Sequence, residues 1–186
     1  DMFDVVIAGA GASGLSLALA LVRGPLRGGT LAIIDKDDQD QLSRHWGYWC
    51  DHATLFDSVP HRSWARLRIV SAAREHVLPL GAYRYNFVRG HDLCSAALDE
   101  LRANPNVRIV RDVVERVDDG PDAARVIARN TVLTGRWVFD SLLNQSDVAR
   151  IRARCRVLRM HFKGWDITAL QPAFDATSAT LFDFRT

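Results

Sequence analysis

Three glycines near the start of the chain, Gly9, Gly11 and Gly14, have the spacing GxGxxG and follow the apolar run 4–8 without a break. The first glycine of such a pattern allows a tight turn, the second lets the backbone approach a pyrophosphate, and the third lets a helix pack closely on a strand. The N–H groups and the dipole at the start of the helix favour an anion, and Ser13 offers a further donor. The pattern predicts a phosphate-binding turn.

A carboxylate answers this turn at the expected distance. Asp35 ends the apolar segment 30–35 and lies about 20 residues after the glycines, where dinucleotide-binding proteins place an acidic residue. It can accept hydrogen bonds from a ribose, and its charge would repel a 2′-phosphate. A dinucleotide site is therefore favoured over a purely structural turn. FAD and NAD share the adenosine diphosphate group that this geometry binds, so these residues do not separate them.

The elements that position these residues form a strand–helix–strand unit. We expect a strand at 4–8, a helix from Leu15 to Val22, and a strand at 30–35 that is buried on both faces. Beyond this unit, alternating segments at about 64–90 indicate antiparallel strands, and 95–103 has helical spacing. The fold class is therefore α/β.

The second half of the chain reads as further strands. We expect them at 107–117, 124–130 and 136–143, with the polar residues 131–135 as a separator and the first strand rejoining the parallel sheet. Residues 147–156 are arginine-rich and are interpreted as a solvated connector. The last two expected strands are 157–168 and 180–186.

The composition narrows the class of protein. The chain has 186 residues, of which 48% are hydrophobic and 25% charged, enough for one globular domain with part of a second. A net charge of +2 without basic clusters argues against a nucleic-acid partner. No segment has the length of a transmembrane helix, although peripheral contact with a membrane stays open. Three separated cysteines favour a cytoplasmic protein without a metal site.

Several segments together resemble the lycopene cyclase family, which consists of flavoproteins. The segments are GAGASGLSLALAL with IID, RHWGYW at 44–49, YNFVRGHDL at 85–93, RWVFDS at 136–141, HFKGWDI at 161–167 and PAFDATSATLFDFR at 172–185. The last two are shared by neither hydroxylases nor NAD dehydrogenases. His45, Met160 and Phe182 depart from the threonine, glutamine and methionine that are commoner in the family.

The resemblance implies a particular architecture. It is a Rossmann-like FAD-binding domain of the hydroxylase-like type over residues 1–150, with the antiparallel strands at about 64–90 inserted. Residues 151–186 would begin the β-sheet of a substrate domain and would leave it truncated. The glutamate-rich motif and the later Gly-Asp segment of the family are expected beyond Thr186.

The resemblance also implies functional residues. The expected cofactor-binding residues are Gly9, Ala10, Gly11, Ser13, Gly14, Asp35, Arg44, Arg89 and Val114, with Arg89 reaching the flavin phosphates. The residues expected near substrate or behind the site are Trp46, Tyr48, Trp49, Trp165, Asp183 and Arg185. An aromatic residue in a strand is more often part of the core, and His161 is interpreted as a packing residue. The main catalytic acid is expected beyond Thr186.

The activity implied is the redox-neutral cyclisation of lycopene ends to β-ionone rings, an isomerase reaction with FAD that is reduced by NAD(P)H. A terminal alkene is protonated, the carbocation is held away from water, and a proton is lost. An acid in an apolar pocket stays protonated at neutral pH and can donate that proton. The alternatives are another FAD-dependent oxidoreductase of the same fold, either a monooxygenase or an isoprenoid reductase, and a binding module without catalysis.

Overall fold

The computed structural model describes most of the chain. The described residues are 2–24, 26–36, 44–54, 57–142, 145–158, 163–165, 167–168, 170–171 and 174–185, with no side-chain description for 145–147. Met160 and His161, two residues of the closing segments discussed above, lie outside the described residues.

The predicted strand–helix–strand unit is confirmed. Strand β1 (Met2–Ala8) leads into helix α1 (Ala12–Arg23), and strand β2 (Leu31–Asp35) lies parallel to β1. Every residue of β2 is buried, as expected for a strand that is covered on both faces.

This unit is the centre of a six-stranded sheet with the order β8-β2-β1-β11-β10-β9. Strands β8 (Val107–Arg111) and β11 (Val132–Asp140) run parallel to their neighbours β2 and β1. Strands β9 (Val114–Asp118) and β10 (Ala124–Ala128) are antiparallel. The separator expected at 131–135 is wrong, because Leu133 is buried in the core and β11 pairs along this stretch with β10.

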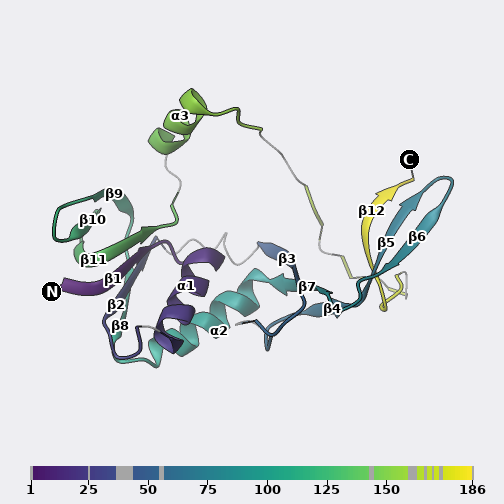
Figure 1. The fold of residues 1–186 in the computed structure, drawn as a ribbon, viewed down its shortest axis with the longest axis horizontal. Helices are drawn as coiled ribbons and strands as arrows, with labels where there is room; N and C mark the ends of the chain where they lie inside the picture. The colour runs from purple at the N-terminus through teal and green to yellow at the C-terminus, as the bar shows by residue number, and fades with distance from the viewer. Residues whose placement is uncertain are drawn as a thin grey trace.

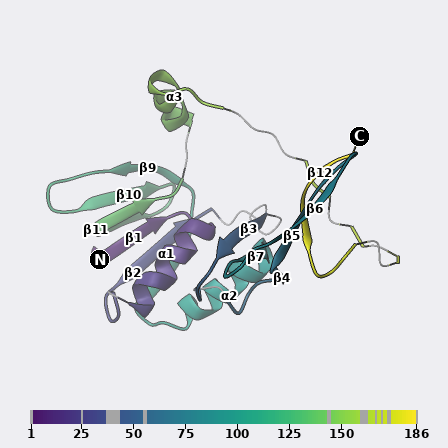
Figure 2. The ribbon, with the colours of Figure 1, turned by 45° about the vertical axis from the view of Figure 1, so that its right-hand side comes forward.

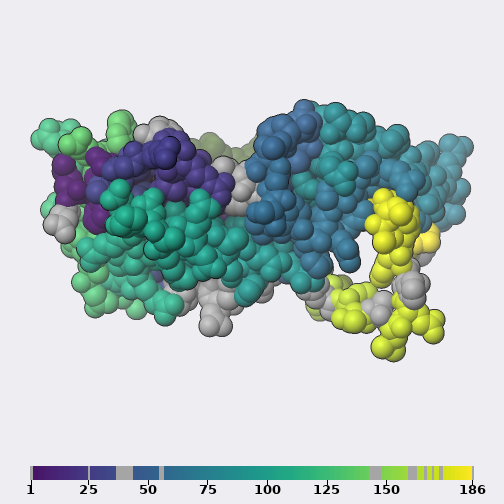
Figure 3. All heavy atoms as spheres, turned by 90° about the horizontal axis from the view of Figure 1, so that it is seen from below, coloured from purple at the N-terminus to yellow at the C-terminus, as the bar shows by residue number. Residues whose placement is uncertain are grey.

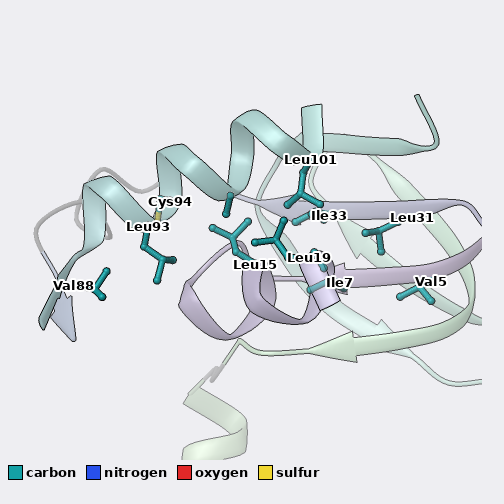
Figure 4. Packing of buried hydrophobic residues seen from close by; sticks show 12 residues of the cluster. Val5, Ile7, Leu15, Leu19, Leu31, Ile33, Val88, Leu93, Cys94 and Leu101 are labelled. Carbon is teal, nitrogen blue, oxygen red and sulfur yellow. The ribbon is translucent and has the colours of Figure 1, made fainter. Parts of the chain in front are cut away.

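The sheet is covered on its two faces by different layers, because alternate residues of a strand point to opposite faces. Val5 and Ile7 of β1 pack with residues of α1 and α2 in one apolar cluster. Val6 and Ala8 pack in a second cluster with Val126 and other residues of β9, β10 and β11. Figure 4 shows the first cluster between the helices and the strands. The helices therefore cover one face of the parallel strands, and the antiparallel strands β9 and β10 of the same sheet pack against the other.

Helix α2 (Gly90–Arg102) begins at Gly90 rather than at the expected Ser95. It follows strand β7 (Arg84–Arg89) directly, and Arg89 is its N-cap residue. The helix starts early because Leu93 and Cys94, in its first turns, are buried against the core and extend its apolar face. Helices α1 and α2 lie side by side on the sheet (Figure 1).

Two small sheets extend from this core, and the antiparallel pairing expected at about 64–90 is present. Strands β3 (His45–Cys50) and β4 (Arg62–Trp64) flank β7 in antiparallel pairs. Strands β5 (Arg66–Ser71) and β6 (Glu75–Pro79) form a hairpin, and β12 (Ala179–Phe184) joins β5 in parallel. Figure 2 shows the second sheet beyond the first, and Figure 3 shows residues 45–89 as a lobe beside the helices.

The segment between β11 and β12 differs from expectation. Helix α3 (Gln145–Arg154) replaces the expected connector, although Arg150, Ile151 and Arg152 are exposed, so its solvation is as expected. The described residues of 157–168 form no strand. They lack a neighbouring strand to pair with, whereas β12 pairs with β5. In the described part of the chain, no helix is long and apolar enough to cross a membrane.

Candidate functional site

The turn between β1 and α1 is built around Gly9. Its φ angle is +106°, a conformation that side chains other than glycine rarely adopt. Its N–H donates to the Ile34 carbonyl oxygen at 2.8 Å. A Cβ atom at Gly9 would lie 2.2 Å from Ser141 Oγ, which donates to the Ala8 carbonyl oxygen at 2.9 Å. The turn therefore joins the ends of β1, β2 and β11 and leaves no room for a side chain.

Gly14 fixes the approach of α1 to this turn. A Cβ atom there would lie 2.0 Å from the Gly9 carbonyl oxygen, so only glycine allows the helix to start so close to the strand. Gly11 is the N-cap residue and provides no side-chain cap. The backbone N–H groups of the first turn are consequently available to an anion, which the helix dipole also favours.

Asp35 lies at the same turn. Its Oδ2 atom accepts a hydrogen bond from the Ala10 N–H at 2.5 Å, and the side chain is buried. Burial raises the pKa of the nearby Cys94 thiol, and the charge of Asp35 raises it further. The acidic residue and the glycine turn are thus in direct contact, although 25 positions separate Ala10 from Asp35.

The two helices begin at the same end of the layer, next to β3 and β7 (Figures 1 and 2). Helix α2, like α1, has no side-chain cap. Arg44 and Arg89 are exposed, the first directly before β3 and the second at the junction of β7 with α2. This end of the helix layer therefore presents the N-termini of α1 and α2 (Figure 1) and the guanidinium groups of Arg44 and Arg89.

Arg89 has a partner that the sequence did not indicate. Its Nη2 atom lies 2.8 Å from Nε2 of His61. His45 lies opposite Arg89 in the β3–β7 register, and the rings of His45 and His61 lie 5.4 and 6.3 Å from the Phe87 ring. Only the pairing of β4 with β7 brings His61 here, so no local pattern could have revealed it.

The three expected aromatic residues of β3 do not form one cluster. Trp46 and Tyr48 pack against the core beneath the helices. Trp49 points to the other face of the strand, is 48% exposed, and its ring lies 4.9 Å from that of Tyr85. Trp64 stacks at 6.2 Å on the same tyrosine. Tyr85 and Trp64 therefore join Trp49 as aromatic candidates that sequence reasoning missed.

Four other expected residues lie on β9, at the end of β12 and between α3 and β12. Asp183 and Arg185 pair with each other at the end of β12, and β12 lies at the opposite end of the molecule from β1 (Figure 1). Trp165 is 74% exposed and carries the Lys163 ammonium 5.3 Å from its ring centroid. Val114 begins β9 and packs in the second core cluster. The structure therefore does not bring Asp183 and Arg185 to the glycine turn, whereas Val114 lies two residues after Asp112, whose N–H donates to the Asp35 carbonyl oxygen at 3.0 Å.

The described residues offer no group of three metal-ligating side chains. The arrangement instead presents the backbone of a helix start with a carboxylate beside it, and such an arrangement suits the phosphates and the ribose of a dinucleotide.

This fold and this turn define a Rossmann-like domain of the kind found in FAD-dependent monooxygenases. The solved structures similar to it include pqsL, a probable FAD-dependent monooxygenase from Pseudomonas aeruginosa, with a TM-score of 0.66 and 17% identity over 87% of this chain and 48% of that one. A second is p-nitrophenol 4-monooxygenase PnpA from Pseudomonas putida, with a TM-score of 0.60 and 17% identity over 75% of this chain and 40% of that one. The Diels-Alderase PyrE3 has a TM-score of 0.56 and 20% identity over 76% of this chain and 32% of that one.

The family model described as "Lycopene cyclase protein" matches residues 4–186, and the chain belongs to that family. No curated protein matches it in sequence. The chain spans less than half the length of the solved structures named above.

Proposed function

We propose that this chain supplies the FAD-binding part of a carotenoid cyclase that converts lycopene ends to β-ionone rings. The observation that carries the proposal is the contact of Asp35 with the glycine turn within a chain of the lycopene cyclase family. The hydroxylase-like fold supports FAD as the dinucleotide.

The residues at the turn fit such a cofactor. The space that a Cβ would fill at Gly9 and Gly14 is already taken, so the backbone itself forms the cradle for the pyrophosphate. The Asp35 carboxylate, beside the turn, would accept a hydrogen bond from a ribose hydroxyl, and Arg89 and Arg44 would neutralise the charge of the phosphates. When bound and reduced by NAD(P)H, the flavin supplies an electron-rich group that stabilises a carbocation.

The aromatic side chains would serve the cation as well. Trp49, Tyr85 and Trp64 form an aromatic cluster on one face of the β3–β7–β4 sheet. Aromatic faces stabilise a desolvated cation by about 2 kcal/mol or more. They would hold the ring-forming end of the substrate away from water, while Trp46 and Tyr48 keep the strand fixed on the core.

Neither Asp35 nor Asp112, the two buried carboxyl groups among the described residues, suits the acid that protonates the alkene. Asp35 is engaged with the Ala10 N–H. For Asp112, burial favours the neutral form, yet hydrogen bonds from the backbone of Asn130 and Val113 and from the side chains of Thr131 and Asn130 together outweigh it and lower its pKa. We therefore propose an acid outside this chain's described residues.

We also propose a division of the chain in which residues 1–150 form the FAD-binding domain and 151–186 begin the substrate domain. The pairing of β12 with β5 supports a substrate-domain sheet that draws on both parts.

The test is an assay, on lycopene with NADPH, of the FAD-loaded longer protein that includes the acid expected beyond Thr186, run in parallel in air and under exclusion of oxygen. A cyclase gives a product of unchanged mass with β-ionone rings and consumes no stoichiometric NADPH. An added oxygen atom or added hydrogen in the product, with matching NADPH consumption, would instead show a monooxygenase or a reductase of the same fold.

A further inference from the structure

The side chain of Arg89 is held by His61, and His61 is itself fixed. The backbone N–H of His61 donates to the Phe87 carbonyl oxygen at 2.9 Å. Its ring lies with its edge toward the Phe87 ring. Both contacts anchor the imidazole to β7, the strand from which Arg89 projects. The distance of 2.8 Å between Arg89 Nη2 and His61 Nε2 is that of a hydrogen bond.

The chemistry of the two groups fixes the direction of this bond. A guanidinium group has N–H donors and no acceptor, and it stays protonated in proteins. His61 Nε2 must therefore be the acceptor, so the ring is neutral and its proton is on Nδ1. Protonation of the ring would place an N–H against an N–H and a second positive charge beside the first.

We propose that neutral His61 is a positioning residue for Arg89, whose guanidinium group it holds toward the FAD site by accepting a hydrogen bond at Nε2. This inference rests on the proposed function, in which Arg89 binds the flavin phosphates. The bond to His61 uses one of five guanidinium N–H groups, so the others stay available to a phosphate.

The positive charges around His61 also favour the neutral form of its ring. His45 lies opposite Arg89 on β3, and Arg62 follows His61 in the chain. In the first turn of α2, His91 Nδ1 lies 3.5 Å from Oδ1 of Asp92, which is the only acidic residue of that turn. The start of α2 also disfavours a cation because of the helix dipole. Protonated His61 would add a positive charge to a place that already holds several.

The first arm of the test is independent of FAD. Nitrogen-15 NMR of the imidazole rings should show His61 with Nδ1 protonated and Nε2 accepting, and the side-chain resonances of Arg89 should differ between wild type and H61F. A neutral His61 with its proton on Nε2 would overturn the inference.

The second arm measures FAD affinity by quenching of flavin fluorescence. H61Q keeps an acceptor oxygen, so it should bind FAD as tightly as the wild-type protein. H61F keeps the ring packing and loses the acceptor, so it should bind FAD about fivefold more weakly.

The matched control is H76Q, because His76 is exposed on β6; this variant should keep the wild-type affinity. If H61Q binds FAD as weakly as H61F, or if H61F binds FAD as the wild-type protein does, the inference is wrong while the proposed function stands. If the wild-type protein binds no FAD, the proposed function fails and the positioning role fails with it, even where NMR shows the bond.

Discussion

The Asp35 carboxylate accepts a hydrogen bond from the Ala10 N–H at 2.5 Å. The acidic end of β2 and the glycine turn after β1 are therefore one structural unit rather than two parts of a site that meet only at a ligand. The same carboxylate would serve both the fold and the adenosine ribose, and the two roles can be separated by substitution.

Asp35→Ala should weaken both the fold and the site. It removes the acceptor of a partly buried N–H, which costs about 1–3 kcal/mol of unfolding free energy. Asp35→Asn keeps an acceptor oxygen and loses the charge, so its stability should stay within about 1 kcal/mol of wild type. Urea denaturation checks the stabilities. Competition between FAD and ADP with or without a 2′-phosphate checks the charge, since Asp35→Asn should tolerate the extra phosphate better. Equal tolerance in wild type and Asp35→Asn would argue against contact with the ribose.

Gly9→Ala should destabilise the protein more than Gly28→Ala. Both glycines have positive φ angles, +106° and +91°, so each substitution carries a backbone cost of about 1–2 kcal/mol. Only at Gly9 would the new Cβ meet a neighbour, Ser141 Oγ at 2.2 Å, whereas at Gly28 the space is open. Thermal unfolding of the two variants measures the difference. Similar melting temperatures would mean that the turn can relax around a side chain.

Leu15→Ala tests the packing that holds α1 on the sheet. Leu15 follows Gly14 directly and is fully buried between the two helices and the strands (Figure 4). Its truncation should cost about 2–5 kcal/mol of unfolding free energy. Leu78→Ala, at a position 42% exposed on β6, is the control and should cost about 1 kcal/mol or less. Urea midpoints that fall equally in both variants would contradict this description of the core.

The pairing of Asp183 with Arg185 should appear in the titration of Asp183. Hydrogen bonds from the Arg185 side chain and backbone lower the pKa of this carboxyl from 3.8 to about 2. Because the folded pKa lies below the unfolded one, the contribution to stability is present above pH 3.8 and is lost as the pH falls toward 2. Arg185→Gln should raise the pKa toward 3.8, as carbon-13 NMR of the carboxyl would show. An unchanged pKa would contradict the pairing, and because both groups are exposed, the effect on stability is small.

The sequence was most informative where the structure depends on local pattern. Gly9, Gly11 and Gly14 follow one strand and open one helix, and Asp35 ends the next strand, so spacing alone predicted the turn and its acidic partner. The early start of α2 was missed because its first turn contains Gly90, a weak helix former. Packing of Leu93 against the core overrides that preference.

The sequence was least informative where strand pairing brings distant residues together. His61 reaches Arg89, and Trp64 reaches Tyr85, only because β4 pairs with β7 in one particular register. A shift of that register by one residue would place these side chains on opposite faces. Side chains alternate between the two faces of a strand, so Trp46 and Trp49, although close in sequence, point to opposite faces of β3.

The most direct test of the central claim is a comparison of ligands at the glycine turn. The protein is equilibrated with FAD, desalted, and examined for flavin absorption, with ADP and FMN as competitors. The account predicts retained FAD that ADP displaces and FMN does not, and loss of retention in Gly14→Ala, whose new Cβ would lie 2.0 Å from the Gly9 carbonyl oxygen. Gly164→Ala, with open space around it, is the control. Displacement by FMN alone, or full retention in a folded Gly14→Ala, would contradict the claim.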